Sequence, residues 1–260
     1  MADGESTPKD ACRPVVIILS IPRSLATIFA RVLMNATDCE AFFGNFFNFY
    51  ANSSTKDAED CINKLEKDME EAKNSGKFVV LKEIAFIIYQ YYFEAFSKLV
   101  DRFDAKLIYL VRHPKPTYVS FHKVLEKDRE LFGMHPPIIL AEIDREKYEP
   151  TWKLYNKHKG HIVIAEELQT EPAKTFKAVF EYIGIEFKEE YLKFEPLGKI
   201  GIPDELQMYL HWYDCCINST EFKTGASNID SIVIEDSKAM NMIEVSQKFY
   251  SLFQQASKSS

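Results

Sequence analysis

An arginine and two hydroxyl side chains follow the first apolar run of the chain. The run PVVIILS (14–20) has the length and β-branched content of a buried strand, and Arg23, Ser24 and Thr27 come directly after it. Apolar residues at helical spacing predict a helix over 23–34. A turn between a strand and a helix directs backbone N–H groups and the positive end of the helix dipole at one point. With the guanidinium and the hydroxyls, this turn suits a phosphate or sulfate group.

A second arginine ends another apolar run. The run AKLIYLVR (105–112) predicts a strand, and Arg112 is its last residue. Ser120 follows eight residues later, in the helix that we expect over 114–132 with a proline in its first turn. An arginine and a hydroxyl at a strand end make a second candidate anion site. Taken alone, the first motif is equally compatible with an ordinary helix cap, and the second with an arginine paired to a carboxylate. The two motifs together are more specific evidence for an anion-binding site.

The predicted elements that carry these side chains are apolar strands that alternate with helices. Such alternation is typical of a parallel sheet covered by helices on both faces, which is an α/β fold. In such sheets ligands bind at the carboxyl ends of the strands, where Arg23 and Arg112 are expected. We predict strands over 14–20, 77–83, 105–112 and 161–167, and helices over 23–34, 55–74, 87–103, 114–132, 141–158, 172–183 and 237–255.

Composition limits the class of protein. The chain has 260 residues and a net charge of −7, which argues against a general nucleic-acid binder but leaves room for a local anion site. Its 5 cysteines form no C-x-x-C pair, which favours a reducing, cytoplasmic location. No apolar run has the length of a membrane span. We expect a disordered lead over 1–13 and a single domain over 14–260, and the oligomeric state stays open.

The two arginine motifs together resemble the sulfotransferase superfamily that uses 3′-phosphoadenosine 5′-phosphosulfate (PAPS). That family has a first-strand motif close to P-[RK]-S-G-[TS]-T, which corresponds here to PRSLAT (22–27). Its second motif is close to L-x-x-x-R-[ND]-P-x-x-x-x-x-S, which corresponds to LIYLVRHPKPTYVS (107–120). A weaker third match covers VIAEELQTEPAKTFKAVFEYIGI (163–185). The resemblance implies a three-layer α/β/α fold with a central parallel sheet, similar to that of P-loop nucleotide-binding proteins.

The resemblance also implies roles for individual residues. Arg23 would contact the sulfuryl group and its bridging oxygen, and Arg112 and Ser120 would hold the 3′-phosphate. The 5′-phosphate would bind at the start of the helix, where the residues are Ser24, Leu25, Ala26 and Thr27. The family's late R-K-G loop has its nearest counterpart at Lys223. No metal is expected, because arginines and oriented amides can neutralise the leaving phosphate.

Two residues depart from the family pattern. Leu25 stands where the family usually has glycine, and Ala26 stands where it usually has serine or threonine. The chain has only 9 glycines, about half of the usual share of roughly 7%. The proposed phosphate loop must therefore turn without a glycine.

The acceptor needs a general base within hydrogen-bond reach. Glu83, at the end of the predicted strand 77–83, is the first candidate, with Lys82 as a partner for the transferred group. His122 should point elsewhere on its helix, and the sequence does not place His113 or His211. Aromatic residues gather over 42–50 and 86–96. Most are expected in the core, and the others are candidates for lining an apolar acceptor pocket.

Three functions remain open from the sequence. The first is a PAPS-dependent sulfotransferase that acts on a hydroxyl or amine of a small, partly apolar molecule. The second is a small-molecule kinase, against which the missing G-x-x-x-x-G-K-[ST] motif argues. The third is a sulfotransferase-like binding module without catalysis, which the altered Leu25–Ala26 pair suggests.

Overall fold

A computed structural model describes most of the chain. The described residues are 13–46, 50, 55–133, 146–197, 211–225 and 228–259. The predicted lead over 1–13 lies outside them except for Arg13, whose Nη1 donates to the backbone oxygen of Asp38 at 3.3 Å. Residues 141–145 of a predicted helix and the aromatic residues Phe47 and Phe49 also lie outside the described residues.

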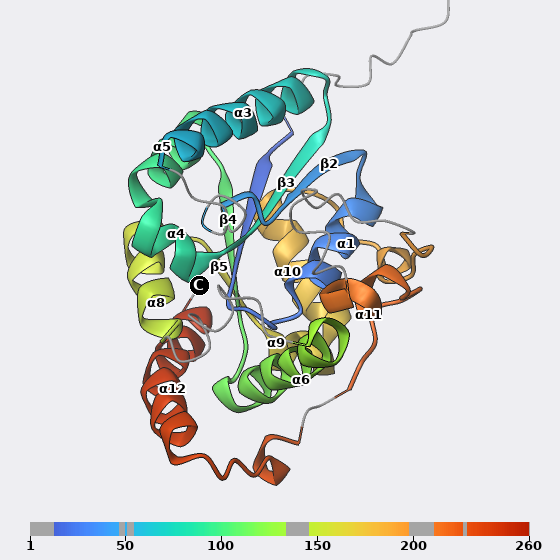
Figure 1. Ribbon diagram of the computed structural model, residues 1–260. Coiled ribbons are helices and arrows are strands. Elements are labelled where there is room, and N and C mark those ends of the chain that lie inside the picture. Colours follow the sequence, from blue (N-terminus) through green and yellow to red (C-terminus); the bar gives the residue numbers. More distant parts are fainter. Residues whose placement is uncertain are drawn as a thin grey trace, which may run out of the picture.

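The centre of the fold is a parallel sheet of five strands (Figure 1). The order across the sheet is β2-β3-β1-β4-β5. The strands are β1 (Val15–Ser20), β2 (Cys39–Phe43), β3 (Phe78–Ile84), β4 (Lys106–Val111) and β5 (His161–Ile164). Each strand runs parallel to its neighbours, and β1 pairs with β3 on one side and β4 on the other.

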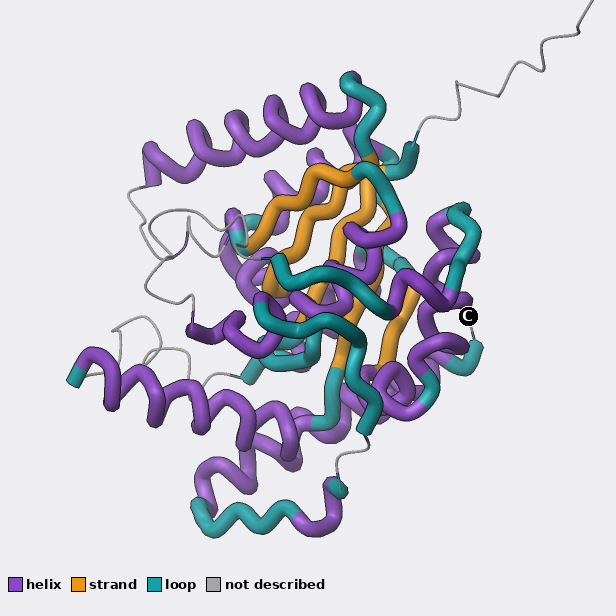
Figure 2. Tube along the Cα trace, turned by 90° about the vertical axis from the view of Figure 1, so that its right-hand side faces the viewer, coloured by secondary structure: helices purple, strands orange, loops and turns teal. Residues whose placement is uncertain are grey.

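Helices connect the strands, as the parallel arrangement requires (Figure 2). They are α1 (Ala26–Ala36), α3 (Thr55–Asn74), α4 (Ala85–Tyr91), α5 (Phe93–Phe103), α6 (Pro114–Phe132), α8 (Tyr148–Lys157), α9 (Ala165–Thr170), α10 (Pro172–Ile183), α11 (Asp214–Ile217) and α12 (Ser237–Ser257). The 3₁₀ turns within the described residues are η1 (Glu189–Leu192) and η3 (Ile229–Ser231). Within the described part of the chain, no helix combines the length and apolarity needed to cross a bilayer.

Side chains that alternate along each strand divide the core into two layers. Val15, Ile17 and Leu19 of β1 pack in the layer that α3, α5, α8 and α12 cover. Val16 and Ile18 pack in the other layer, with α1, α6 and α10. Strands buried on both faces explain why the sequence shows continuous apolar runs rather than alternation. The structure thus confirms the α/β fold with helices on both faces of a parallel sheet.

The structure differs from the predictions in three elements. The segment Cys39–Phe43, in front of the aromatic stretch, forms the edge strand β2. The helix predicted over 87–103 is two helices, because the backbone at Tyr92 leaves helical geometry with φ −132° and ψ 19°. The strand predicted over 161–167 ends at Ile164, and the following AEELQT segment forms α9.

The strand order places the first motif at the centre of the sheet. Strands β2 and β3 lie on one side of β1 in the sheet, whereas the later strands β4 and β5 lie on its other side. The order of strands therefore changes direction at β1. Such a change of direction leaves a crevice at the carboxyl ends of the strands, where ligands of open α/β sheets bind. The residues after β1, β3 and β4 therefore meet at one edge.

Candidate active site

The loop between β1 and α1 has a strained backbone. Arg23 has a φ of +65° and Leu25 a φ of +74°, which is the left-handed region. In the described part of the chain these are two of three non-glycine residues with positive φ. The Leu25 backbone oxygen starts α1 by accepting from the Phe29 N–H at 3.0 Å, and none of the described side chains caps the helix. Its first N–H groups consequently point into the loop without an intrahelical acceptor.

Three side chains of the two sequence motifs meet at this loop. Arg23 Nε donates to Ser120 Oγ at 3.2 Å. Arg112 Nη1 donates to the backbone oxygen of Arg23 at 3.0 Å. The structure thus brings together Arg23, Arg112 and Ser120, which come from the ends of β1 and β4 and from α6. Arg112 thereby holds the backbone of the strained loop.

Arg112 is buried and held by a polar network. The Tyr148 hydroxyl donates to the Arg112 backbone oxygen at 2.8 Å, next to Thr117. Glu166 accepts from the His113 N–H through Oε1 and from the Tyr250 hydroxyl through Oε2, each at 3.0 Å. Burial lowers the pKa of Arg112, and the Glu166 carboxylate opposes that shift. An anion at this guanidinium would relieve the cost of its burial.

Ser24 and Thr27 are both buried at the start of α1. The Ser24 side chain has 0% exposure, and its Oγ has no hydrogen-bond partner among the described residues. A buried hydroxyl without a partner costs free energy unless a ligand or water satisfies it. Together with the free helix amides and the two arginines, this hydroxyl makes a donor set that fits a phosphate or sulfate group.

Lys82 and Glu83 lie near the end of β3, as the predicted strand 77–83 places them, and both are buried. As successive residues of a strand, they point to opposite faces of the sheet. Asn45 donates its backbone N–H to Glu83 Oε1 at 2.7 Å. Burial lowers the pKa of Lys82; the Glu83 carboxylate opposes this shift and Arg23 adds to it. Lys82 therefore lies in the electrostatic environment of both Glu83 and Arg23.

The segment from His211 to Ile217, here called the covering segment, was missed by the sequence analysis. Arg23 Nη1 donates to the Trp212 backbone oxygen at 3.3 Å. Tyr213 is half-buried, and desolvation of its hydroxyl raises its pKa to about 12, with Arg23 opposing the shift and Glu83 adding to it. The signal in the sequence is weak, because HWYDCC has no spacing that points to a strand-end site.

The remaining histidines and Lys223 have other environments. His113 caps α6 by accepting the Lys115 N–H on Nδ1. The His122 ring lies against the Tyr118 ring, with centroids 4.1 Å apart. His211 Nε2 lies 2.5 Å from Asp128 Oδ1. Lys223 is exposed and, among the described residues, contacts neither arginine of the site.

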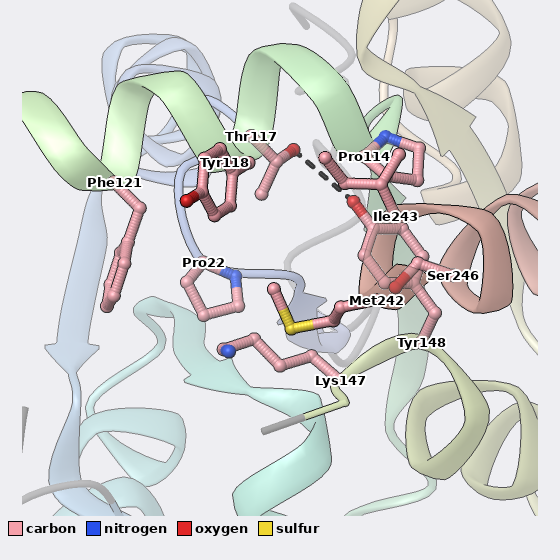
Figure 3. Close-up of a pocket in the computed structure, with 10 residues that line it drawn as sticks. All are labelled: Pro22, Pro114, Thr117, Tyr118, Phe121, Lys147, Tyr148, Met242, Ile243 and Ser246. Carbon is pink, nitrogen blue, oxygen red and sulfur yellow. Dashed lines mark hydrogen bonds between the residues drawn. The ribbon is translucent and has the colours of Figure 1, made fainter. Parts of the chain in front are cut away.

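A shallow pocket adjoins the loop on its α12 side (Figure 3). Pro22, which precedes Arg23, forms one wall, and Tyr118 and Phe121 extend into the pocket from α6. Lys147 brings an ammonium group to a mostly apolar lining. The other lining residues are Pro114, Thr117, Tyr148, Met242, Ile243 and Ser246. Most aromatic residues near the site pack in the core instead, including Phe43, Phe46, Phe86 and Phe96.

Comparisons with known proteins agree with the fold. A family model for the sulfotransferase domain matches residues 13–195. No curated protein sequence matches the chain significantly. Mouse sulfotransferase SULT7A1, solved in complex with PAP (3′-phosphoadenosine 5′-phosphate), is a similar structure with a TM-score of 0.53 and 12% identity; the match covers 95% of this chain and 90% of that one. The sulfotransferase domain from the curacin biosynthetic pathway gives a TM-score of 0.51 and 14% identity, with coverages of 89% and 97%. The family model spans more than half of the chain, and the chain therefore belongs to the sulfotransferase domain family.

Proposed function

We propose that the protein transfers a sulfuryl group from PAPS to a hydroxyl or amine of a small, partly apolar acceptor. The observation that carries this proposal is the meeting of Arg23, Arg112 and Ser120 at the uncapped N-terminus of α1. When bound, PAPS supplies an activated sulfuryl group with a phosphate as its leaving group. The structure of mouse SULT7A1 in complex with PAP supports the choice of nucleotide.

Different residues at the loop would bind the 5′-phosphate and the 3′-phosphate of the nucleotide. The N–H groups of Leu25, Ala26 and Thr27 and the hydroxyls of Ser24 and Thr27 would bind the 5′-phosphate. Arg23 would neutralise charge on the bridging oxygen as it develops, which is where electrostatic catalysis acts. Arg112 and Ser120 would bind the 3′-phosphate, and Lys223 is proposed as an outer contact.

Residues on the two faces of β3 would contact the transferred group and the acceptor, respectively. Lys82 lies on the face that α1 covers, beside Val80 in the core, and would contact the transferred group. Glu83 lies on the opposite face, beside Val79 and Leu81 of the other core layer. The apolar pocket that begins at Pro22 adjoins the same loop as Arg23. We propose that Glu83 takes the proton from the acceptor, whose apolar part would occupy that pocket.

A thermal-shift titration with PAP tests the nucleotide site. We expect PAP to raise the unfolding temperature of the wild type, because a ligand that binds only the folded state stabilises it. The Arg112→Ala variant should lose most of this rise. Arg102→Ala is the matched control, since Arg102 pairs on the surface with Glu66 and Glu70. A rise with Mg-ATP but none with PAP would instead support a kinase.

The catalytically inactive binding module remains the second candidate. It is favoured by the loop itself, in which Leu25 holds a positive φ at the family's glycine position and Ala26 offers no hydroxyl. Binding of PAP without transfer of labelled sulfate from PAPS to any member of a broad acceptor panel would select this candidate. Transfer to one acceptor would exclude it.

A further inference from the structure

A buried carboxylate on α6 lies away from the residues that the proposed function uses. Asp128 has 0% exposure and lies eight residues after Ser120, which is about two helical turns. Its Oδ1 accepts from Trp212 Nε1 at 3.0 Å and lies 2.5 Å from His211 Nε2. Because an ionised carboxylate only accepts hydrogen bonds, His211 Nε2 carries the hydrogen in this pair.

These two contacts stabilise a carboxylate whose burial costs free energy. A buried carboxylate is tolerated only where donors compensate its lost hydration. In the described part of the chain, Asp128 Oδ2 has no partner, so the compensation falls on the two donors at Oδ1. Asp128 thus fixes the side chains of His211 and Trp212 on α6.

Further contacts hold the rest of the covering segment between α6 and α1 (Figure 1). Lys127 pairs with Asp214 at 2.8 Å, and the Trp212 ring packs edge-on against Phe121. Arg31 of α1 donates to the backbone oxygen of Cys216. The segment is therefore anchored from both sides, and Asp128 is its buried anchor.

The backbone of the anchored segment reaches the proposed sulfuryl-binding arginine. Arg23 donates to the Trp212 backbone oxygen through Nη1 and to Ser120 Oγ through Nε. Two acceptors on different N–H groups fix the plane of a guanidinium, because its donors have a rigid geometry. One acceptor comes from α6 itself, and the other is held on α6 by Asp128.

We infer that Asp128 is a positioning residue that orients Arg23 through Trp212. The role of Arg23 in transfer rests on the proposed function, whereas its orientation by the covering segment does not. His211 and Trp212 lie beyond residues 13–195, which the family model matches, whereas Asp128 and Arg23 lie within that range. A preorientated guanidinium loses less entropy when an anion binds.

Nuclear magnetic resonance tests the inference without nucleotide or turnover. The ¹⁵N–¹H cross-peak of Arg23 Nε is assigned by its loss in Arg23→Lys, and the indole cross-peak of Trp212 by comparison with Trp152→Phe. In Asp128→Asn we expect both peaks to shift and the Arg23 peak to broaden. Glu126→Gln removes the same charge from an exposed position on the same helix, and it should leave both peaks in place.

Two further measurements complete the test. Trp212→Phe removes the indole donor but keeps the ring, and it should shift the Arg23 peak even if Asp128→Asn fails to fold. Calorimetry with PAP should show roughly tenfold weaker binding in the Asp128→Asn variant, the size expected for one hydrogen bond to a charged group.

The outcomes separate the inference from the proposed function. If the Trp212 peak moves in Asp128→Asn while the Arg23 peak does not, or if the Arg23 peak stays in place in Trp212→Phe, Asp128 does not position Arg23 and the inference is wrong. If the wild type does not bind PAP, the proposed function fails, and the two cross-peaks still decide the orientation of Arg23.

Discussion

The left-handed backbone at Leu25 makes a prediction about stability. A non-glycine residue in this region costs about 1–2 kcal/mol, because its Cβ approaches the following carbonyl oxygen. Replacing Leu25 by glycine removes this cost, but it also removes the packing of the Leu25 side chain against the second core layer. Leu25→Ala removes the same packing and keeps Cβ. The difference between the two variants therefore isolates the backbone strain.

The expected difference follows from two opposing terms. Glycine avoids the strain of about 1–2 kcal/mol. It also loses more backbone entropy than alanine on folding, which costs roughly 0.5–1 kcal/mol. We thus expect Leu25→Gly to be more stable than Leu25→Ala by about 0.5–1 kcal/mol. For a chain of this size that is a rise of roughly 2 °C in unfolding temperature.

Urea unfolding followed by circular dichroism measures this difference, with thermal unfolding as a second readout. Ala30→Gly is the control of opposite sign: Ala30 lies inside α1, where glycine should cost about 1 kcal/mol relative to alanine. Equal stability of the two Leu25 variants, or greater stability of Leu25→Ala, would refute the strain argument. The loop would then have a right-handed backbone at Leu25 in solution.

Three other substitutions test the packing around the sheet. Gly160→Ala should destabilise the protein by about 1–3 kcal/mol in urea unfolding, because a Cβ there would lie 2.4 Å from the Leu107 backbone oxygen; stability equal to the wild type would contradict this close approach. Tyr109→Phe removes a buried hydroxyl that donates to the His158 backbone oxygen at 2.7 Å, and should cost about 1 kcal/mol by the same measurement, whereas no loss would mean that the bond is absent. Burial lowers the pKa of His161 below its unfolded value of about 6.5, so the folded state binds fewer protons and stability is lost as the pH falls below that value. Thermal unfolding at pH 7.5 and 5.5 should therefore show a smaller acid-induced loss in His161→Gln than in the wild type, and an equal loss would count against this origin.

The sequence predicts the centre of the fold well for a physical reason. Strands β1 and β4 are buried on both faces, so their apolar runs have few other structural solutions. The α6 bounds agree with the prediction because Pro114 starts the helix and Gly133 ends it with a φ of +70°. The structure brings Arg23, Arg112 and Ser120 together as the order of elements suggests, since parallel strands have their carboxyl ends at one edge.

The missed features depend on tertiary contacts. Strand β2 is a half-buried edge strand of five residues, and its aromatic residues resemble core packing as much as a strand. The contact of Asp128 with Trp212 joins residues 84 positions apart, and no local pattern encodes it. The backbone of Leu25 could not be predicted from its residue type either. Leucine disfavours the left-handed region, and the surrounding sheet and α1 impose that conformation.

The central claim is that the site at Arg23 and Arg112 transfers sulfuryl groups from PAPS. The most direct measurement incubates the protein with ³⁵S-labelled PAPS and a panel of small phenols, alcohols and amines, and follows label in the products. We predict transfer to at least one apolar acceptor by the wild type and by Arg102→Ala, and none by Arg23→Ala or Arg112→Ala. Transfer that survives in both of these variants would contradict the assigned site, and PAP binding without any transfer would contradict the claim of catalysis.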